Sequence, residues 1–211
     1  MWLLDSPRLL DALSYAGTAV FAATGALAAL RTRQDVVTAT FFAAMTGIGG
    51  GTLRDVLMGV PVGWMQQPAY LATCLVVGAV VWSLGYPKWG HRALMWLDAV
   101  GLGAFAVLGA ARAVGHGEAA LVAVLMGVIT VSAGGIIRDL LAGEPSILLK
   151  REIYITAAAF GAAVFVLSAP WLGAWAGIAG FVAGFGMRAF ALITGWSLPP
   201  FKGALWRGRE D

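Results

Sequence analysis

Two short motifs place charged side chains directly after clusters of glycine, in a chain with few charges. The first reads GIGGGTLRDVLMG over residues 47–59, and the second reads SAGGIIRDLLAGEP over residues 132–145. Each contains an adjacent arginine and aspartate, Arg54–Asp55 and Arg138–Asp139. Glycine is a poor helix former, and charge is costly in apolar surroundings. Because both features recur in the same order, we expect them to lie close to the functional site.

The composition is that of an integral membrane protein. Of the 211 residues, 60% are hydrophobic and 12% are charged, and the mean hydropathy is +0.82. A soluble domain usually carries about 25% charged residues. The net charge is +3. Because the basic residues fall in short loops, this charge indicates membrane topology and not a nucleic-acid partner.

Seven apolar stretches are predicted to be transmembrane helices, each long enough to cross about 30 Å of hydrocarbon. The predicted spans are about 9–30, 36–59, 67–85, 93–113, 118–143, 151–169 and 172–195. The connections between them are short, so residues 1–211 are predicted to form a single transmembrane domain that ends in a short cytoplasmic tail, 196–211. The fold class is therefore all-α.

The lysines and arginines are distributed unequally between the two sides of the predicted membrane. One side receives only Arg8 and Arg112. The other receives nine basic residues: Arg31, Arg33, Lys88, Arg92, Lys150, Arg151, Lys202, Arg207 and Arg209. Because the richer side is normally cytoplasmic, the sequence predicts a multi-pass protein of the cell inner membrane with its N-terminus outside and its C-terminus in the cytoplasm.

The two motifs belong to an internal repeat with an offset of 84 residues. This offset aligns Gly50 with Gly134 and Arg54 with Arg138, and seven of the twelve positions from 50 to 61 are identical. Three predicted spans separate equivalent positions, so the second unit should enter the membrane upside down. Such inverted repeats are typical of proteins that build a pathway around a pseudo-two-fold axis. Repeat one covers about 9–85 and repeat two about 93–169, and the helix at about 172–195 is additional.

The glycines near the middle of the second and fifth predicted spans leave two interpretations open. A helix could bend or unwind there, and the freed carbonyl groups could line a wet pathway and coordinate cations. Alternatively, Gly47 and Gly51, four residues apart, could let another helix approach closely. Both can hold at once. The polar side chains that are candidates to line the pathway are Thr18, Thr46, Thr130 and Ser132.

The charged side chains inside the spans need partners. Adjacent residues on a helix point about 100° apart, so Arg54 and Asp55 are not expected to face each other. Asp11 begins the first span in the outer half of the membrane, and Asp98 begins the fourth span in the inner half. We therefore expect Asp11 near Arg54 and Asp98 near Arg138. These charges could line the pathway or serve only as structural bridges.

Other chemistry is excluded by context. The segment GIGGGT looks like a dinucleotide-binding loop, but that motif needs a strand before it and a helix after it, and apolar helix flanks it here on both sides. His91 and His116 fall on opposite sides of the predicted membrane, so they cannot share a metal or catalytic site. The chain is therefore not expected to be an enzyme or to bind a metal or cofactor. Cys74 is expected to be a small buried hydrophobic residue.

The segments FAATGA, GGGTLRD and GGIIRDLLAGEPSILLKREIY resemble the trimeric intracellular cation channel family, in its prokaryotic, glycine-transporter-like branch. The resemblance extends from Leu10 to about Thr194 and implies seven transmembrane helices, a homotrimer, and one ion pathway in each protomer. The implied activity is passive conduction of K⁺ and Na⁺. A secondary transporter for a small amino acid such as glycine is the alternative.

The resemblance also assigns roles to individual positions. It implies that the second and fifth helices are broken at their glycine clusters, and these line the pathway: Gly49, Gly50, Gly51, Gly134 and Gly135. The arginines and aspartates that follow, Arg54, Asp55, Arg138 and Asp139, are included in the predicted pathway. Membrane lipids are further implied partners, because parts of the family bind lipid phosphates near the fifth helix, where Arg138 is the candidate contact.

Overall fold

The fold is given by a computed structural model, which describes residues 7–88, 90–147 and 153–199, with side chains from residue 13 onward. Within this part the chain forms eight helices and no strand. The helices are α1 (Pro7–Arg31), α2 (Val36–Leu57), α3 (Gly63–Gln66), α4 (Ala69–Leu84), α5 (Gly90–Gly115), α6 (Ala120–Leu141), α7 (Ile155–Leu172) and α8 (Trp175–Thr194).

Six of the described helices are long and apolar enough to cross a membrane: α1, α2, α5, α6, α7 and α8. Helix α4 has 16 residues, which corresponds to about 24 Å at 1.5 Å per residue. The structure therefore confirms an all-helical membrane protein in which the seven predicted stretches coincide with α1, α2 and α4 to α8. A seventh crossing, by α4, remains a prediction.

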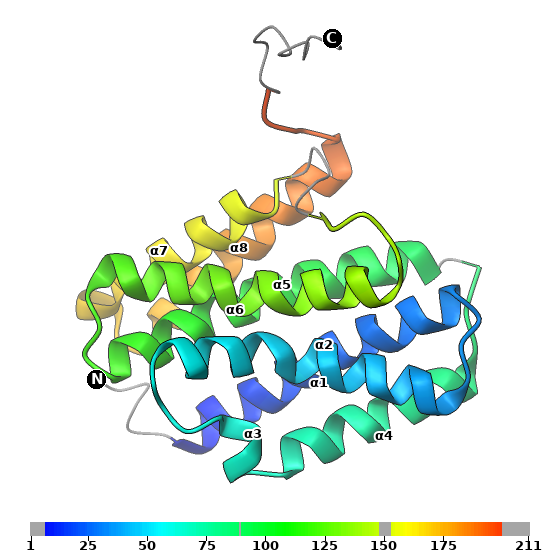
Figure 1. Cartoon of the computed structure of the whole chain (residues 1–211). Helices are drawn as coiled ribbons and strands as arrows, with labels where there is room; N and C mark the ends of the chain where they lie inside the picture. The colour runs from blue at the N-terminus through cyan, green and yellow to red at the C-terminus, as the bar shows by residue number, and fades with distance from the viewer. Residues whose placement is uncertain (1–6, 89, 148–152, 200–211) are drawn as a thin grey trace, which may run out of the picture.

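The helices form two groups of three with an additional helix (Figure 1). Helices α1, α2 and α4 pack against one another, and so do α5, α6 and α7. Helix α8 packs on α7 and α5. The two groups meet where α2 lies against α6 and α1 lies against α5. This arrangement follows the two predicted repeats, since each group uses the same order of elements.

Equivalent residues of the two groups meet reciprocally at the contact between α2 and α6. A Cβ atom at Gly50 would overlap the carbonyl oxygen of Thr130, and one at Gly134 would lie 2.8 Å from the carbonyl oxygen of Thr46. The offset of 84 residues converts the first contact into the second. Position 46 thus lies beside 134 and position 50 beside 130, so the two helices run antiparallel.

The same local symmetry places an aromatic pair between α1 and α5. Phe21 and Phe105 are separated by the repeat offset of 84 residues. Their rings pack edge to face with centroids 5.1 Å apart, a favourable geometry for aromatic rings. Phe21 also contacts Gly101 and Gly134. The side chain of Phe21 therefore fills the space between α1, α5 and α6 at the point where the two groups meet.

The glycine clusters do not interrupt their helices. Residues 36–57 and 120–141 are continuous helix, and none of the cluster glycines has a positive φ. The breaks expected at Gly49, Gly50, Gly51, Gly134 and Gly135 are therefore not confirmed. Unbroken helices satisfy their own backbone groups, as lipid surroundings demand. The missing side chains at Gly50 and Gly134 instead allow two backbones to approach closely. Close packing was the other interpretation for Gly47 and Gly51: a Cβ atom at Gly47 would lie 3.1 Å from the carbonyl oxygen of Thr18, whereas one at Gly51 would meet no other helix within 4 Å.

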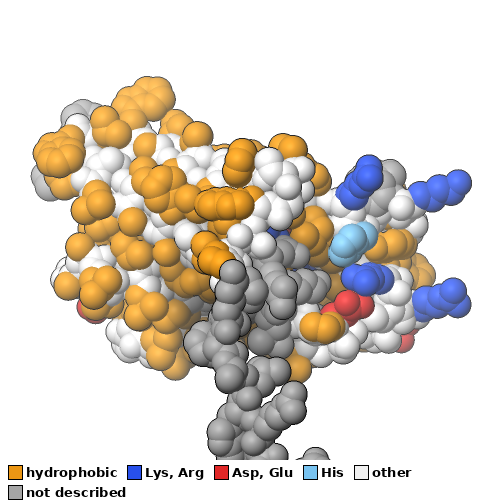
Figure 2. Space-filling model, turned by 90° about the horizontal axis from the view of Figure 1, so that it is seen from above, with side chains coloured by type: hydrophobic (Ala, Val, Ile, Leu, Met, Phe, Trp, Pro, Cys, Tyr) orange, Lys and Arg blue, Asp and Glu red, His pale blue; other side chains and the backbone are white. Residues whose placement is uncertain are grey.

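The exposed surface separates into apolar sides and a charged end. Figure 2 shows hydrophobic side chains over most of one face, with basic side chains gathered at one end. The exposed Arg33 and Lys88 lie in the α1–α2 and α4–α5 connections, and the exposed Arg31 and Arg92 lie at the adjoining ends of α1 and α5. In the α1–α2 connection, Asp35 caps α2, and its pKa is lowered because its carboxylate accepts a hydrogen bond from the backbone N–H of Thr38.

Adjacent glycines of α2 offer a test of the close contact. Gly50→Ala should destabilise the protein by about 1–3 kcal/mol, as overpacking typically does, because the new methyl group meets the Thr130 carbonyl oxygen. Gly51→Ala is the matched control, since its Cβ atom would have only the Arg54 Nη2 atom within 4 Å, at 3.7 Å. Thermal unfolding of the purified variants in detergent compares the two. Equal unfolding temperatures would contradict the contact.

Candidate functional site

The Arg138 side chain is buried within a cluster of two carboxylates. It lies in the last turn of α6 with 1% of its surface exposed. Its Nη1 donates a 2.6 Å hydrogen bond to Oδ1 of Asp98, which is fully buried in α5. Its Nε donates to Oδ1 of Asp139 at 2.9 Å. The predicted pairing of Asp98 with Arg138 is thus confirmed, and Thr24 adds a 3.4 Å contact to Nη1.

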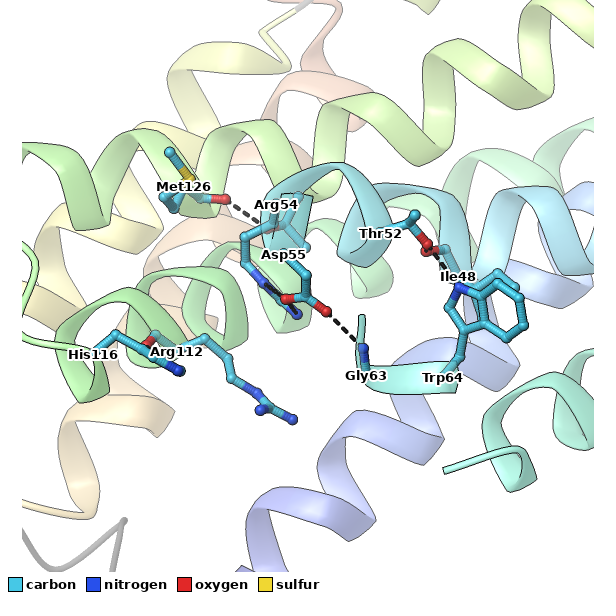
Figure 3. A network of polar contacts seen from close by, with 10 residues as sticks. Ile48, Thr52, Arg54, Asp55, Gly63, Trp64, Arg112, His116 and Met126 are labelled. Carbon is cyan, nitrogen blue, oxygen red and sulfur yellow. Dashed lines mark hydrogen bonds and ion pairs between the residues drawn. The ribbon is translucent and has the colours of Figure 1, made fainter. Parts of the chain in front are cut away.

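Arg54 pairs with its own neighbour in sequence. Its Nε and Nη2 both donate to Oδ1 of Asp55, at 2.9 and 2.7 Å (Figure 3). The expectation that these residues do not face each other was wrong. Their Cβ atoms diverge by about 100°, but the long arginine side chain bends back to the carboxylate. The side chain of Asp11 lies outside the described part of the structure, so its proximity to Arg54 stays a prediction.

Each aspartate also fastens the loop that follows its helix. Oδ2 of Asp55 accepts a hydrogen bond from the backbone N–H of Gly63 at 2.9 Å. Oδ2 of Asp139 accepts one from the N–H of Ile147 at 2.7 Å. The two contacts are again separated by the repeat offset of 84 residues. In both repeats, one carboxylate therefore holds a guanidinium with one oxygen and the returning chain with the other.

Two separate cavities border these charge clusters. The Arg54 cavity has a volume of about 60 Å³, and its lining includes Ser14, Thr18, Arg54, Asp55, Trp64 and Arg112. The Arg138 cavity has a volume of about 30 Å³, and its lining includes Arg31, His91, Arg138, Asp139, Glu144 and Ile147. Because α2 and α6 run antiparallel, the cavities lie toward opposite ends of their contact.

The uncharged candidates lie mainly between the cavities. Gly51 and Thr18 line the Arg54 cavity, and a Cβ atom at Gly135 would lie 3.3 Å from the hydroxyl of Tyr154 and 3.9 Å from Arg138 Nη2. The others are buried without lining either cavity: Gly49, Gly50, Gly134, Thr46, Thr130 and Ser132. Their side chains and backbones form the tight part of the α2–α6 region, which separates the two cavities.

Some polar atoms in this region have no hydrogen-bond partner among the described residues. They are Oγ1 of Thr46, Oγ of Ser132 and Oδ2 of Asp98. Thr130 differs, because its hydroxyl donates to the carbonyl oxygen of Met126 at 2.6 Å. Buried polar atoms are normally paired with protein or ordered water. The three atoms are therefore buried polar groups without a described partner, and none of their residues lines either cavity.

Sequence reasoning assigned no role to several charged residues. Arg188 of α8 is buried, with its guanidinium carbon 5.5 Å from the ring centroid of Tyr154. At the Arg138 cavity, Arg31 forms a 3.2 Å ion pair with Glu144. The sequence did hold a signal for Arg188, because it is an arginine inside a predicted span. It held none for the Arg31–Glu144 pair, because no local sequence pattern relates these two positions. Among the described residues, no group of three or more side chains could hold a metal ion.

The lipid contact suggested for Arg138 is not favoured by its surroundings. The guanidinium is almost completely buried and already holds two carboxylates. A phosphate group would have to displace Asp98 or Asp139 to reach it. The burial therefore favours a role for Arg138 within the protein.

The Asp98–Arg138 pair can be tested by a double-mutant cycle. Arg138→Met should cost about 3–5 kcal/mol, as loss of one partner of a buried pair does in soluble cores. Adding Asp98→Asn should recover part of the loss, because the uncompensated carboxylate is removed. The control cycle uses Arg54→Met with Ser14→Ala, since Ser14 stands at the repeat position of Asp98. Strictly additive unfolding energies for Asp98 and Arg138 would contradict the pair.

Comparison with known proteins agrees with this fold. A family model described as "Glycine transporter" matches residues 11–86 and again residues 95–170, so its two matches reproduce the internal repeat. The membrane protein YvgT of Bacillus subtilis, described as UPF0126, is 36% identical over 199 residues, which cover 90% of this chain and 95% of that protein. The inner membrane protein YadS of Escherichia coli is 40% identical over 158 residues, covering 72% and 75%.

Solved structures give the same result. The TRIC trimeric intracellular cation channel orthologue from Rhodobacter sphaeroides is 45% identical and superposes with a TM-score of 0.85, over 89% of this chain and 99% of that chain. A prokaryotic TRIC channel crystallised in 0.5 M KCl is 26% identical with a TM-score of 0.83, over 90% and 98%. The resemblance noted in the sequence is thereby confirmed, and the chain belongs to the prokaryotic branch of the trimeric intracellular cation channel family.

Proposed function

We propose that this protein is a homotrimeric channel that conducts K⁺ and Na⁺ passively, with one pathway inside each protomer. Its similarity to TRIC channels supports a cation channel. The main support for a pathway inside the protomer is the pair of cavities lined by charged residues at opposite ends of the α2–α6 contact. The trimer and the permeant ions come from the family relationship.

In the proposed pathway, ions pass between the Arg54 cavity and the Arg138 cavity along α2 and α6. Once the pathway opens, the buried oxygens of Thr46, Ser132 and Asp98, which have no hydrogen-bond partner in the described part of the chain, would offer ligands to water or cations. The tight Gly50–Thr130 and Gly134–Thr46 contacts separate the cavities, so this structure corresponds to a closed pathway. Opening would require α2 and α6 to part or to bend at their glycines.

The arginines do not prevent cation conduction in this proposal, because each is neutralised. Arg54 is paired with Asp55, and Arg138 with Asp98 and Asp139. A guanidinium held by carboxylates presents much less positive potential to a passing cation than a free one. The side chains that bury the charges thus also make the route tolerable for cations.

A secondary transporter for a small amino acid is the second candidate. The description of the matching family model, "Glycine transporter", favours it. The same two cavities, opened alternately around a pseudo-two-fold axis, would suit alternating access. A transporter cycles slowly and saturates with substrate, whereas an open channel passes ions in discrete current steps.

Recording in planar bilayers tests the proposed function. The purified protein should give discrete K⁺ current steps. In a Cys74→Ala background, Ser14→Cys places a thiol in the lining of the Arg54 cavity, so a positively charged thiol reagent should reduce the current severalfold. The matched control is Glu118→Cys, which lies exposed in the α5–α6 connection and should be modified without effect on the current. Silent bilayers with saturable glycine uptake would instead identify a transporter.

The proposed topology places repeat two upside down relative to repeat one, with the N-terminus outside and the C-terminus in the cytoplasm. The antiparallel, reciprocal contact of α2 with α6 supports the inverted repeat. Because the excess of lysine and arginine marks the cytoplasmic side, a reporter at the C-terminus should react only with cytoplasmic reagents. Labelling of that reporter from the outside of intact cells would show that the orientation is the opposite of the proposed one.

A further inference from the structure

The connection between α2 and α4 forms part of the wall of the Arg54 cavity. It runs from residue 58 to residue 68 and contains the short helix α3. Gly63 and Trp64 of α3 line the cavity together with Thr52 and Asp55 of α2. Figure 3 shows the backbone of Gly63 directed at Asp55 and the ring of Trp64 beside Thr52. The connection therefore folds back along α2 on the side that faces the cavity.

Two hydrogen bonds fasten this connection to α2. The backbone N–H of Gly63 donates to Oδ2 of Asp55 at 2.9 Å. The indole N–H of Trp64 donates to Oγ1 of Thr52 at 3.0 Å. The Thr52 hydroxyl donates its own proton to the carbonyl oxygen of Ile48, at 2.8 Å, so a lone pair of the same oxygen is directed at the indole. Both acceptors lie three residues apart on one side of α2.

Apolar packing contributes little to holding α3 in place. None of its four residues is buried. The connection begins beside Gly59, which has a φ of +64° and no atom within 4 Å of its Cβ position. Near the other end, an exposed contact of 3.4 Å joins the hydroxyl of Tyr15 to Oε1 of Gln67. Segments with few buried apolar contacts open locally at a low free energy, while the rest of the fold stays intact.

We propose that the connection 58–68 is a lid on the Arg54 cavity, which is closed in this structure and latched by the Trp64–Thr52 hydrogen bond. Opening the lid breaks this bond and the bond between Gly63 and Asp55, and it joins the cavity to the solvent. The bond to the Asp55 carboxylate is charge-assisted and is the stronger of the two. The indole bond is the adjustable one, because it can be removed without changing any charge beside Arg54.

The second repeat keeps the carboxylate contact, between Asp139 and the N–H of Ile147, but not the latch. Its residues at the two latch positions are Ile136 and Leu148, whose side chains have no hydrogen-bonding atoms. The latch therefore belongs to one cavity only, and access to the two cavities can be controlled separately. An effect of the lid on conduction rests on the proposed function, whereas its effect on access to the cavity does not.

Rates of thiol modification in the purified full-length protein test the lid. Thr18 lines the cavity and is 4% exposed, so Thr18→Cys in a Cys74→Ala background places the single thiol behind the lid. A charged, water-soluble thiol reagent should react in proportion to the open fraction of the lid. Trp64→Phe removes the donor and keeps a ring, and Thr52→Val removes the acceptor and keeps the shape. Each should raise the rate about threefold to tenfold, the usual effect of losing one neutral hydrogen bond.

The matched control is Trp82→Phe, which removes an indole bond of 3.2 Å to the carbonyl oxygen of Gln34, at the opposite end of α2. It should leave the rate unchanged, and unfolding temperatures confirm that all variants fold. Because Trp64→Phe and Thr52→Val remove the same bond, the double variant should react no faster than the faster single variant.

Three results would overturn the lid: unchanged rates in both single variants, an equal rise in Trp82→Phe, or multiplying effects in the double variant. The thiol rate is measured without a current, so a failure of the lid is distinguished from a failure of the proposed channel. If both proposals hold, Trp64→Phe should also increase the K⁺ current in planar bilayers.

Discussion

The guanidinium groups of Arg54 and Arg138 are buried within membrane-spanning helices and each is neutralised by a carboxylate beside it, and much of the structure follows from that pairing. Arg54 and Arg138 lie near the ends of α2 and α6, and each is neutralised by the aspartate that follows it in sequence. Those aspartates use their second oxygens to hold the returning loops. The pairing that stabilises the buried charge therefore also fixes where the chain turns after each helix and shapes the wall of each cavity.

The second constraint is the distance between α2 and α6. Two backbones approach closely at Gly50 and Gly134 because neither has a side chain, and each meets the carbonyl group of the other helix. The repeat offset converts the Gly50–Thr130 contact into the Gly134–Thr46 contact, so the same packing geometry occurs twice. Closely packed helices at the centre bring the charge clusters to opposite ends of one contact. The glycines and the charges are thus parts of the same arrangement.

The sequence predicted what depends on composition, on periodic repetition and on charge within apolar segments. These signals gave the helices, the repeat and the pairing of Asp98 with Arg138, because few carboxylates were available at that depth. It could not give the Arg54–Asp55 contact, since helical geometry describes the direction of Cβ atoms and not the reach of an arginine side chain. It also predicted breaks at glycines that remain helical, because glycine permits both unwinding and close packing and only the neighbouring helix decides between them.

The two repeats have kept their backbone contacts while their charges have diverged. Asp98 in repeat two corresponds to Ser14 in repeat one, and Arg112 corresponds to Ala28. One substitution places an extra carboxylate beside Arg138, and the other places an extra guanidinium beside the Arg54 cavity. Neither residue takes part in the α2–α6 contact, so the symmetric framework tolerates both. Two cavities built on the same fold are thereby lined by different charged side chains among the described residues, although the backbone framework around them is shared.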